Sequence, residues 1–377
     1  MANPFKNLFS FGKKSASVLG IDIGSSAIKV VQLRKKNDKA VLETYGELAL
    51  GPYGGVEIGQ ATTLSTEKMV EALTDLMAEK EVNLTTNSAG MAIPFGSSLM
   101  ALMEMPAVSY QQLSTMIPLE ARKYIPVPIS EVTLDWTVIP KEENEDVKEE
   151  SDEIEKKVET TKVKKTDVLL VAIHNETLAR YQEIIRKTGL QSSFFEIEIF
   201  STMRSILEDD QAPVMIFDMG AASCKLYIVE RGIVRLSHTI NRGSQDITQT
   251  ISKSLGIPVA QAEVIKRTLG ALPGADKDIR NLARLSLDYV FSEANQLVLN
   301  YERKYKKTLG KIMMVGGGSS LKGLTDLAKD SFQTPVVAGN PFSKTEAPAF
   351  LENILQETGP EFAVAVGVAL RKLQELD

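Results

Sequence analysis

The chain has 377 residues, and its hydrophobic content of 43% and charged content of 24% are those of an ordinary soluble globular protein with one large or two smaller domains. The formal net charge of −6 argues against a general nucleic-acid-binding role. The single cysteine, Cys224, excludes an internal disulfide framework and a cysteine-based zinc site.

The first residues carry no sign of export or membrane insertion. No apolar run in the chain reaches the ~18 residues of a membrane span, and residues 1–16 lack the apolar core of a signal peptide, so a cytoplasmic location is expected. Phe5, Leu8 and Phe9 would share one face of a helix. We interpret this segment as a tail; the alternative is a short helix that docks on a membrane surface or on a partner.

Residues 18–33 predict a strand, a tight turn and a second strand. The turn consists of small residues whose N–H groups can point together at one anion, and Gly24 can take a positive φ and lets the backbone come close to a ligand. An aspartate at the end of the first strand suits a hydrated Mg²⁺ ion. The candidate ligand-binding residues are Asp22, Gly24, Ser25, Ser26 and Lys29.

A second copy of this pattern occupies residues 215–228. Its aspartate, glycine and lysine (Lys225) stand at the same relative positions, and the lysine follows the aspartate by seven residues in both copies, 29 − 22 and 225 − 218. An internal repeat of this kind indicates two similar lobes that face one another. The residues of the second copy that we expect at the ligand are Asp218, Gly220, Ala221, Ala222 and Ser223.

The stretch between the two copies combines parts of the first lobe with an inserted region. A helix and a strand within residues 65–95 continue the first lobe, which spans 17–96. Residues 97–187 predict a separate α+β subdomain, whose charged segment at 141–165 lacks periodicity and is typical of a disordered, solvated loop. The chain then returns to the first lobe at 188–212 and brings Glu198 to a strand end.

The second lobe, residues 213–377, contains a helical subdomain at about 257–308. Its helix at 259–269 carries Glu263 and Lys266 one turn apart. The simplest interpretation of these two residues is an exposed ion pair, which contributes little to stability.

A glycine run follows the strand predicted at 311–315, and a helix is predicted after it at 321–328. Strand, glycine run and helix form a geometry that brings backbone N–H groups and a helix N-terminus against a nucleotide. Three consecutive glycines are hard to explain by structure alone, because each costs conformational entropy. The small residues of the last helix, at 362–370, suit close packing near the same site. The residues of the run are Gly316, Gly317, Gly318 and Ser319.

Two Asp-x-Gly hairpins followed by a strand, a glycine run and a helix resemble the superfamily of actin, heat-shock chaperone and sugar-kinase ATPases. The resemblance covers almost the whole chain. It implies an α/β, two-lobed actin-like ATPase fold with mixed sheets and an extra α+β subdomain inserted in the first lobe. The place of that insertion and the segment at 120–136 are similar to the PilM family of type IV pilus assembly proteins, in the FtsA-like branch of the superfamily.

The resemblance implies that ATP and Mg²⁺ bind between the lobes. Asp22 and Asp218 would hold the hydrated metal, and Lys29 would hold the phosphates together with the backbone of both turns. Glu263 and Lys266 would lie at the ribose and the base, and the glycine run at the adenosine.

Glu198 matches a superfamily position at which a glutamate orients the water that attacks the phosphate. Slow ATP hydrolysis, efficient turnover and a purely conformational role of the nucleotide all remain open, with nucleotide binding favoured over efficient turnover.

The resemblance also implies a partner, the N-terminal cytoplasmic peptide of a PilN-like inner-membrane protein, bound as an extended segment between the first lobe and the inserted subdomain. Other pilus inner-membrane platform proteins and further copies of the chain are additional candidates; contact with the membrane would be indirect, and no nucleic acid is expected. One alternative is an FtsA-like membrane-tethered filament protein of cell division, anchored by residues 1–11. A sugar-kinase-like phosphotransferase is less favoured, because no aspartate of the first lobe stands out as a general base.

Overall fold

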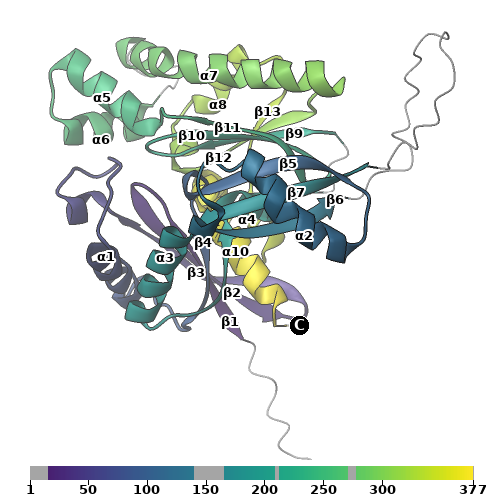
Figure 1. The fold of residues 1–377 in the computed structure, drawn as a ribbon. Coiled ribbons are helices and arrows are strands. Elements are labelled where there is room, and N and C mark those ends of the chain that lie inside the picture. The colour runs from purple at the N-terminus through teal and green to yellow at the C-terminus, as the bar shows by residue number, and fades with distance from the viewer. Residues whose placement is uncertain (1–15, 140–164, 209–211, 271–276, 377) are drawn as a thin grey trace, which may run out of the picture. The chain divides into compact units, whose positions relative to one another are not determined.

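The computed structural model describes residues 16–139, 165–208, 212–270 and 277–376 (Figure 1). The predicted tail at 1–16 and the predicted charged loop at 141–165 fall outside the described residues, except for the last residue of each. Lys165 belongs to a strand and not to the loop. The chain separates into two compact units, one made of residues 94–182 and the other of the residues before and after them.

The first five-stranded sheet of the larger unit combines an antiparallel meander with two parallel strands. β1 pairs antiparallel with β2, and β2 with β3, whereas β4 and β8 join β1 in parallel. Burial is almost continuous along β1, as expected for a strand covered on both faces. In sheet order the strands are β3 (Lys39–Ala49), β2 (Ala27–Lys36), β1 (Ser17–Ile23), β4 (Ser88–Ile93) and β8 (Gln191–Ile197).

The second five-stranded sheet repeats this plan. β9 pairs antiparallel with β10, and β10 with β11, whereas β12 and β13 join β9 in parallel. Every residue of β9 is buried. In sheet order the strands are β11 (Ile233–Ile240), β10 (Cys224–Glu230), β9 (Val214–Met219), β12 (Lys311–Val315) and β13 (Val336–Ala338). The internal repeat of the sequence is therefore a duplicated sheet, with β9–β10 in the role of β1–β2.

Two helices pack against the first sheet and against each other at glycines. α10 (Ala363–Gln374), yellow in Figure 1, crosses β1 and contacts α4 (Glu198–Ile206). A Cβ atom on Gly367 would lie 1.8 Å from the carbonyl oxygen of Ser201, and one on Gly20 would lie 1.9 Å from that of Ala365. Only glycine allows these backbones to approach so closely. This lobe also contains α1 (Thr66–Ala78), capped by Ser65, and α9 (Glu352–Thr358).

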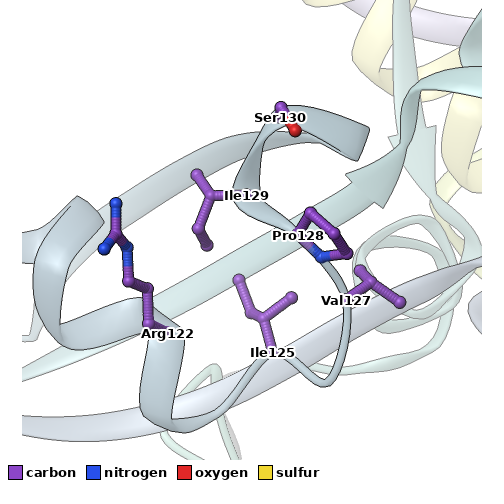
Figure 2. Close-up of a pocket in the computed structure, with 6 residues that line it drawn as sticks. All are labelled: Arg122, Ile125, Val127, Pro128, Ile129 and Ser130. Atoms are coloured by element: carbon purple, nitrogen blue, oxygen red, sulfur yellow. The ribbon is translucent and has the colours of Figure 1, made fainter.

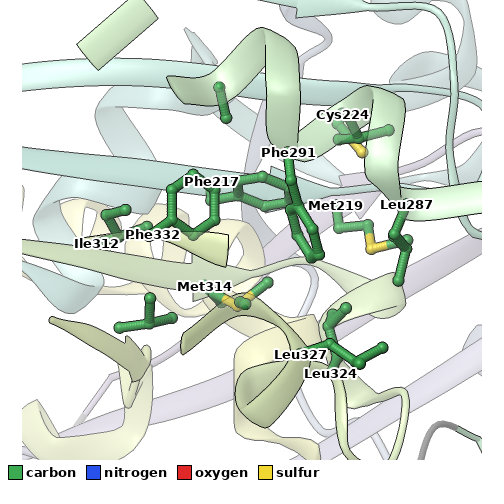
Figure 3. Packing of buried hydrophobic residues seen from close by; sticks show 14 of the residues in the cluster. Phe217, Met219, Cys224, Leu287, Phe291, Ile312, Met314, Leu324, Leu327 and Phe332 are labelled. Carbon is green, nitrogen blue, oxygen red and sulfur yellow. The ribbon is translucent and has the colours of Figure 1, made fainter. Parts of the chain in front are cut away.

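Helices and aromatic rings form the core behind the second sheet. Phe217 on β9 lies 6.1 Å from Phe291 and 6.5 Å from Phe332 between ring centroids, and the last two lie 5.4 Å apart (Figure 3). The thiol of Cys224 is buried in the same cluster, and burial raises its pKa, so it is a structural residue. The helices are α5 (Ser244–Leu255), α6 (Val259–Leu269), α7 (Lys277–Tyr305) and α8 (Leu324–Ser331).

The helix predicted at 321–328 begins three residues later than expected. The glycine run continues into a 3-10 turn, η5 (Gly317–Ser320), and Gly323 then takes a φ of +78° just before α8. Because this turn separates the glycine run from α8, the helix N-terminus does not follow the run directly.

The smaller unit is built on a three-stranded antiparallel sheet. β7 (Lys165–His174) lies between β5 (Ser98–Pro106) and β6 (Val132–Ile139). Its helix α2 (Tyr110–Glu120) buries Leu113 and Ile117 in the core, and the ring of Tyr110 stacks on that of Trp136, 4.7 Å away. α3 (Asn175–Thr188) follows β7.

Candidate functional site

The ends of two hairpins carry the aspartate and the lysine of each repeat. Asp22 is paired with Lys29 across β1 and β2, and Asp218 is paired with Lys225 across β9 and β10. Residues opposite one another in an antiparallel pair have Cβ atoms roughly 5 Å apart. The spacing of seven therefore places each lysine beside its own aspartate.

One backbone hydrogen bond closes each turn in the same place. Gly24 N–H donates to Ala27 O at 3.0 Å, and Gly220 N–H donates to Ser223 O at 2.9 Å. Neither glycine has a positive φ, so neither turn uses the left-handed conformation that glycine allows. Space explains the glycines instead, because a Cβ atom would lie 3.1 Å from Ala27 O or 3.0 Å from Ser223 O.

The other predicted turn residues lie at the same two hairpin ends and differ in exposure. Ser25 is exposed, whereas Ala221 is buried. Ser26, Ala222 and Ser223 are half-buried.

Two buried carboxylates hold Lys225. Its Nζ lies 2.6 Å from Oε1 of Glu198, the first residue of α4, and 3.7 Å from Oδ2 of Asp218. Burial alone lowers the pKa of Lys225, but the charges of Glu198 and Asp218 outweigh this and raise it above its usual range. The predicted water-orienting residue Glu198 is therefore engaged by a cation in this structure.

Lys29 has more distant partners. Its Nζ lies 3.8 Å from Oε2 of Glu361 and 4.0 Å from Oε1 of Glu47. Glu361 precedes α10 and accepts a hydrogen bond from the Ser320 hydroxyl at 2.9 Å. Burial raises the pKa of Glu361 against the attraction of Lys29. Among the described residues, no carboxylate therefore holds the Lys29 ammonium as closely as Glu198 holds that of Lys225.

Two members of the glycine run are required for packing. Gly316 has a φ of +86°, and a Cβ atom there would lie 2.3 Å from Oδ1 of Asp218. A Cβ atom on Gly318 would lie 2.5 Å from Cγ of Met219. Contrary to the sequence-based expectation, structure alone explains these two glycines: they let β12 end directly against the end of β9.

Gly317 is the member of the run that faces the first hairpin. A Cβ atom there would lie 3.3 Å from Nζ of Lys29. The hydroxyl of Ser319 turns back instead and donates to Gly316 O at 2.6 Å. The backbone of the glycine run therefore lies next to residues of both hairpins.

Glu263 and Lys266 are buried, so the interpretation as an exposed ion pair is wrong. Glu263 Oε2 lies 2.7 Å from Nζ of Lys266 and accepts from the Thr248 hydroxyl at 2.6 Å, and its Oε1 lies 2.8 Å from Nε of Arg267. Burial raises the pKa of Glu263, but Lys266 and these hydrogen bonds outweigh it and hold that pKa below its usual range. Burial lowers the pKa of Lys266. The pair is a fixed polar group on α6.

The chemistry of the donors suits a hydrated magnesium ion that is shared with phosphate. Burial, and then the charge of Glu198, raises the pKa of Asp22 to about 7, and burial raises the pKa of Asp218. Within the described ranges, no three His, Cys, Asp or Glu side chains gather closely enough to hold a metal ion. Mg²⁺ keeps several waters and uses few carboxylates. The two aspartates therefore fit a metal that brings waters and phosphate oxygens with it.

Sequence reasoning missed several residues of this site. Lys225 stands in the repeat at the position that matches Lys29, and this match is the signal that assigns it to the site. Glu47 lies opposite Lys29 across β2 and β3, whereas Glu361 carries no motif and only the fold brings it to Lys29.

The smaller unit has a pocket of its own, with a volume of about 380 Å³ (Figure 2). In Figure 2 the side chains of Ile125 and Ile129 face one another and Arg122 lies to one side. The pocket is formed by the segment between α2 and β6. Its lining residues are Arg122, Ile125, Val127, Pro128, Ile129 and Ser130.

Two lobes with the same sheet order, each ending in an Asp–Lys pair, define an actin-like ATPase fold, as predicted. A solved PilM–PilN type IV pilus biogenesis complex has this fold, with a TM-score of 0.76 and 23% identity over 94% of this chain and 98% of that chain. MreB 5 of Spiroplasma citri, solved with AMPPNP bound, has a TM-score of 0.51 and 11% identity over 96% of this chain and 97% of its own.

The family model of the type IV pilus assembly protein PilM matches residues 20–373. The chain therefore belongs to the PilM family of type IV pilus assembly proteins, which confirms the predicted resemblance. It is also 26% identical over 217 residues to the cell division protein FtsA of Pseudomonas aeruginosa, over 52% of this chain and 51% of FtsA. The chain thus spans about half the length of the curated relatives it matches. In the part of the chain that the structure describes, no helix is both long and apolar enough to cross a membrane.

Proposed function

We propose that this protein binds ATP with Mg²⁺ between its two lobes and uses the nucleotide to control the docking of a PilN-like peptide during type IV pilus assembly. One observation carries the proposal: the duplicated hairpins bring two Asp–Lys pairs and the glycine run to one place. Carboxylates for a hydrated cation and ammonium groups for phosphate are the complement of a metal–nucleotide ligand.

In this proposal Lys29 binds the phosphates together with the backbone of both turns. Asp22 and Asp218 hold the waters of the metal, which would neutralise phosphate charge when bound. Glu263 and Lys266 contact the ribose and the base. Gly317, which faces Lys29, lies between the phosphate and adenosine ends of the ligand.

We further propose that the nucleotide acts mainly as a conformational ligand and that its hydrolysis is slow. The support is the 2.6 Å contact between Glu198 and Lys225, since a carboxylate engaged by a cation is poorly placed to orient a water. Glu198→Gln would then leave both nucleotide affinity and the slow release of phosphate nearly unchanged. Phosphate release at several turnovers per second by the unaltered chain would contradict this role.

The proposed partner is the N-terminal peptide of a PilN-like membrane protein, which would bring this protein to the cytoplasmic face of the inner membrane. Further platform proteins and self-association are part of the same proposal. Membership of the PilM family and the fold shared with a PilM–PilN complex support it. The apolar pocket at Ile125 and Ile129 is our candidate for the part of the smaller unit that receives a peptide side chain.

Calorimetric titration of the intact chain with ATP and Mg²⁺ tests nucleotide binding. We expect one site, and we expect Asp22→Ala to abolish the dependence of affinity on Mg²⁺. Asp38→Ala is the matched control, because the Asp38 side chain is 95% exposed in a turn. Equal affinities for all three proteins would show that the metal and phosphate assignment is wrong.

Fluorescence anisotropy with a labelled PilN-like N-terminal peptide tests the partner. We expect binding whose affinity changes when ATP and Mg²⁺ are added. Ile129→Lys in the pocket is expected to weaken it, and Thr137→Lys on the exposed part of β6 is the control. A peptide that fails to bind with and without nucleotide would count against the proposed partner, while leaving nucleotide binding intact.

A further inference from the structure

The connection between β3 and α1 crosses from the first lobe to the second. We call its residues 57–62 the strap. Figure 1 shows this purple connection reaching up to α6. It is fixed at its base, because Val56 N–H donates to Gly51 O at 3.0 Å and Gln60 N–H donates to Glu57 O at 3.2 Å. The strap is therefore an ordered segment with a defined tip.

On the side of the first lobe, the connection is hydrogen-bonded to the first turn. Thr62 N–H donates to Ser25 O at 2.9 Å, and Leu50 N–H donates to Ser26 O at 2.8 Å. Both ends of the connection are thus bound to carbonyl groups of the turn that the proposed function assigns to phosphate. A shift of that turn must move the strap with it.

On the side of the second lobe, the strap meets α5. Ala61 N–H donates to the side-chain Oε1 of Gln245 at 3.0 Å. The backbone N–H of Gln245 in turn donates to Ala221 O at 3.1 Å, in the second turn. Since Ala61 and Thr62 share a peptide bond, three hydrogen bonds join Ser25 of the first turn to Ala221 of the second.

The tip of the strap also touches the polar group on α6. Gly59 has a φ of +88°, and a Cβ atom there would lie 2.5 Å from Oε1 of Glu263. That carboxylate is held by Lys266 and Arg267, so it cannot move aside without breaking its own contacts. Glycine at this position lets the strap lie directly on Glu263.

From this geometry we infer that the strap is a latch: it holds the two phosphate turns together over a bound nucleotide, and it must open before the nucleotide leaves. The inference rests on the proposed function and adds a regulatory step to it. Residues 57–62 carry backbone contacts to both lobes, and none of them is among the residues that we assign to the ligand. Weakening the strap should therefore speed nucleotide release more than it changes the fold.

The first test removes the acceptor for Ala61. In Gln245→Ala we expect a fluorescent ATP or ADP analogue, bound with Mg²⁺, to dissociate about 2- to 10-fold faster, the range that corresponds to one neutral hydrogen bond. Gln249→Ala is the matched control, since Gln249 is exposed one turn further along α5. Gln245→Glu retains an acceptor and should restore slow release.

The second test disrupts the contact between the strap and Glu263. Gly59→Ala places a methyl group against the fixed carboxylate and should speed release at least as much as Gln245→Ala. Gly55→Ala is its control, because Gly55 has a similar φ of +70° but a Cβ atom there would meet no atom of the described residues within 4 Å. The difference between the two variants isolates the contact with the second lobe from backbone strain.

Hydrogen exchange provides a measurement that needs no nucleotide. The amide of Ala61 should exchange faster in Gln245→Ala than in Gln249→Ala. If the unaltered chain binds nucleotide but Gln245→Ala and Gly59→Ala both release it at the same rate as the unaltered chain, the latch is refuted and the proposed function stands. If the unaltered chain binds no nucleotide, both are refuted.

Discussion

The two hairpins at the centre of this protein have the same backbone and different surroundings. Each has its lysine opposite its aspartate and a glycine turn closed by one hydrogen bond, at 3.0 Å in one and 2.9 Å in the other. In the second hairpin, Lys225 lies 2.6 Å from Glu198. In the first, the carboxylate oxygens of Glu361 and Glu47 lie 3.8 and 4.0 Å from Lys29. Duplication preserved the geometry of the turn, but the charges around the two lysines differ.

This difference assigns the two lysines to different tasks. A cation that two buried carboxylates hold is structural, because its removal leaves those charges without a partner. A cation with distant partners is available to an incoming phosphate. We therefore infer that Lys225 maintains the joint between α4 and the second sheet, whereas Lys29 responds to the ligand.

The largest expected effect comes from replacing Lys225, which lies closer to a carboxylate than Lys29 does. Lys225→Met should lower the free energy of unfolding by about 3 kcal/mol or more, because Glu198 and Asp218 would remain buried without a counter-charge. Lys29→Met should cost less than about 1 kcal/mol, because its partners are distant. Urea denaturation of the two variants at neutral pH measures both values.

Equal losses of stability in Lys225→Met and Lys29→Met would contradict the division of tasks. The double variant Lys225→Met with Glu198→Gln is a useful control. Removing the partner carboxylate together with the lysine should recover part of the stability, since one uncompensated charge is then gone.

The second prediction concerns nucleotide affinity, for which we expect Lys29 to matter more than Lys225. Lys29→Met should weaken the binding of ATP with Mg²⁺ by about 10- to 100-fold, which is what the loss of one charge-assisted hydrogen bond corresponds to. Lys29→Arg keeps the charge and should lose less. Calorimetric titration provides the affinities, and an unchanged affinity in Lys29→Met would remove this residue from the phosphate site.

The sequence predicted the parts of this site that lie close together along the chain. The seven-residue spacing is short enough for a single hairpin to set the positions of Asp22 and Lys29, so local pattern was sufficient. Glu361 reaches Lys29 only because α10 packs across the first sheet. Nothing near Glu361 in the sequence encodes that approach.

The glycine run is a pattern that the sequence shows plainly but whose cause the sequence alone does not identify. The sequence predicts that a ligand requires these glycines, whereas the structure shows that Gly316 and Gly318 are required by the close approach of the end of β9. The later start of α8 has a local cause, the φ of +78° at Gly323. A glycine pattern cannot by itself distinguish a ligand that needs space from a neighbouring backbone that needs it.

The third prediction uses the raised pKa of Asp22, about 7 compared with an ordinary value of 3.8. Between these two values the folded chain holds a proton that the unfolded chain has lost, so stability without nucleotide should fall as pH rises from about 4 to 7. Asp22→Asn should flatten this slope and be more stable than the unaltered chain above pH 7, by roughly 1–2 kcal/mol after allowance for solvent screening. Denaturation series at several pH values measure the slope, and an unchanged slope in Asp22→Asn would assign it to another group.

The smallest expected effect tests what the two hairpins share. A methyl group at Gly24 or at Gly220 would meet the carbonyl oxygen of its own turn at 3.1 or 3.0 Å, and neither position has a positive φ. Gly24→Ala and Gly220→Ala should therefore each cost about 1 kcal/mol of stability, and the two costs should agree within about 0.5 kcal/mol, since the turn itself must give by a few tenths of an ångström. Urea denaturation of the nucleotide-free variants measures both. If the two stability losses differ clearly, the surroundings of the hairpins affect the turns as well as the lysines. The conclusion that the hairpins share a backbone and differ only in their charges would then be wrong.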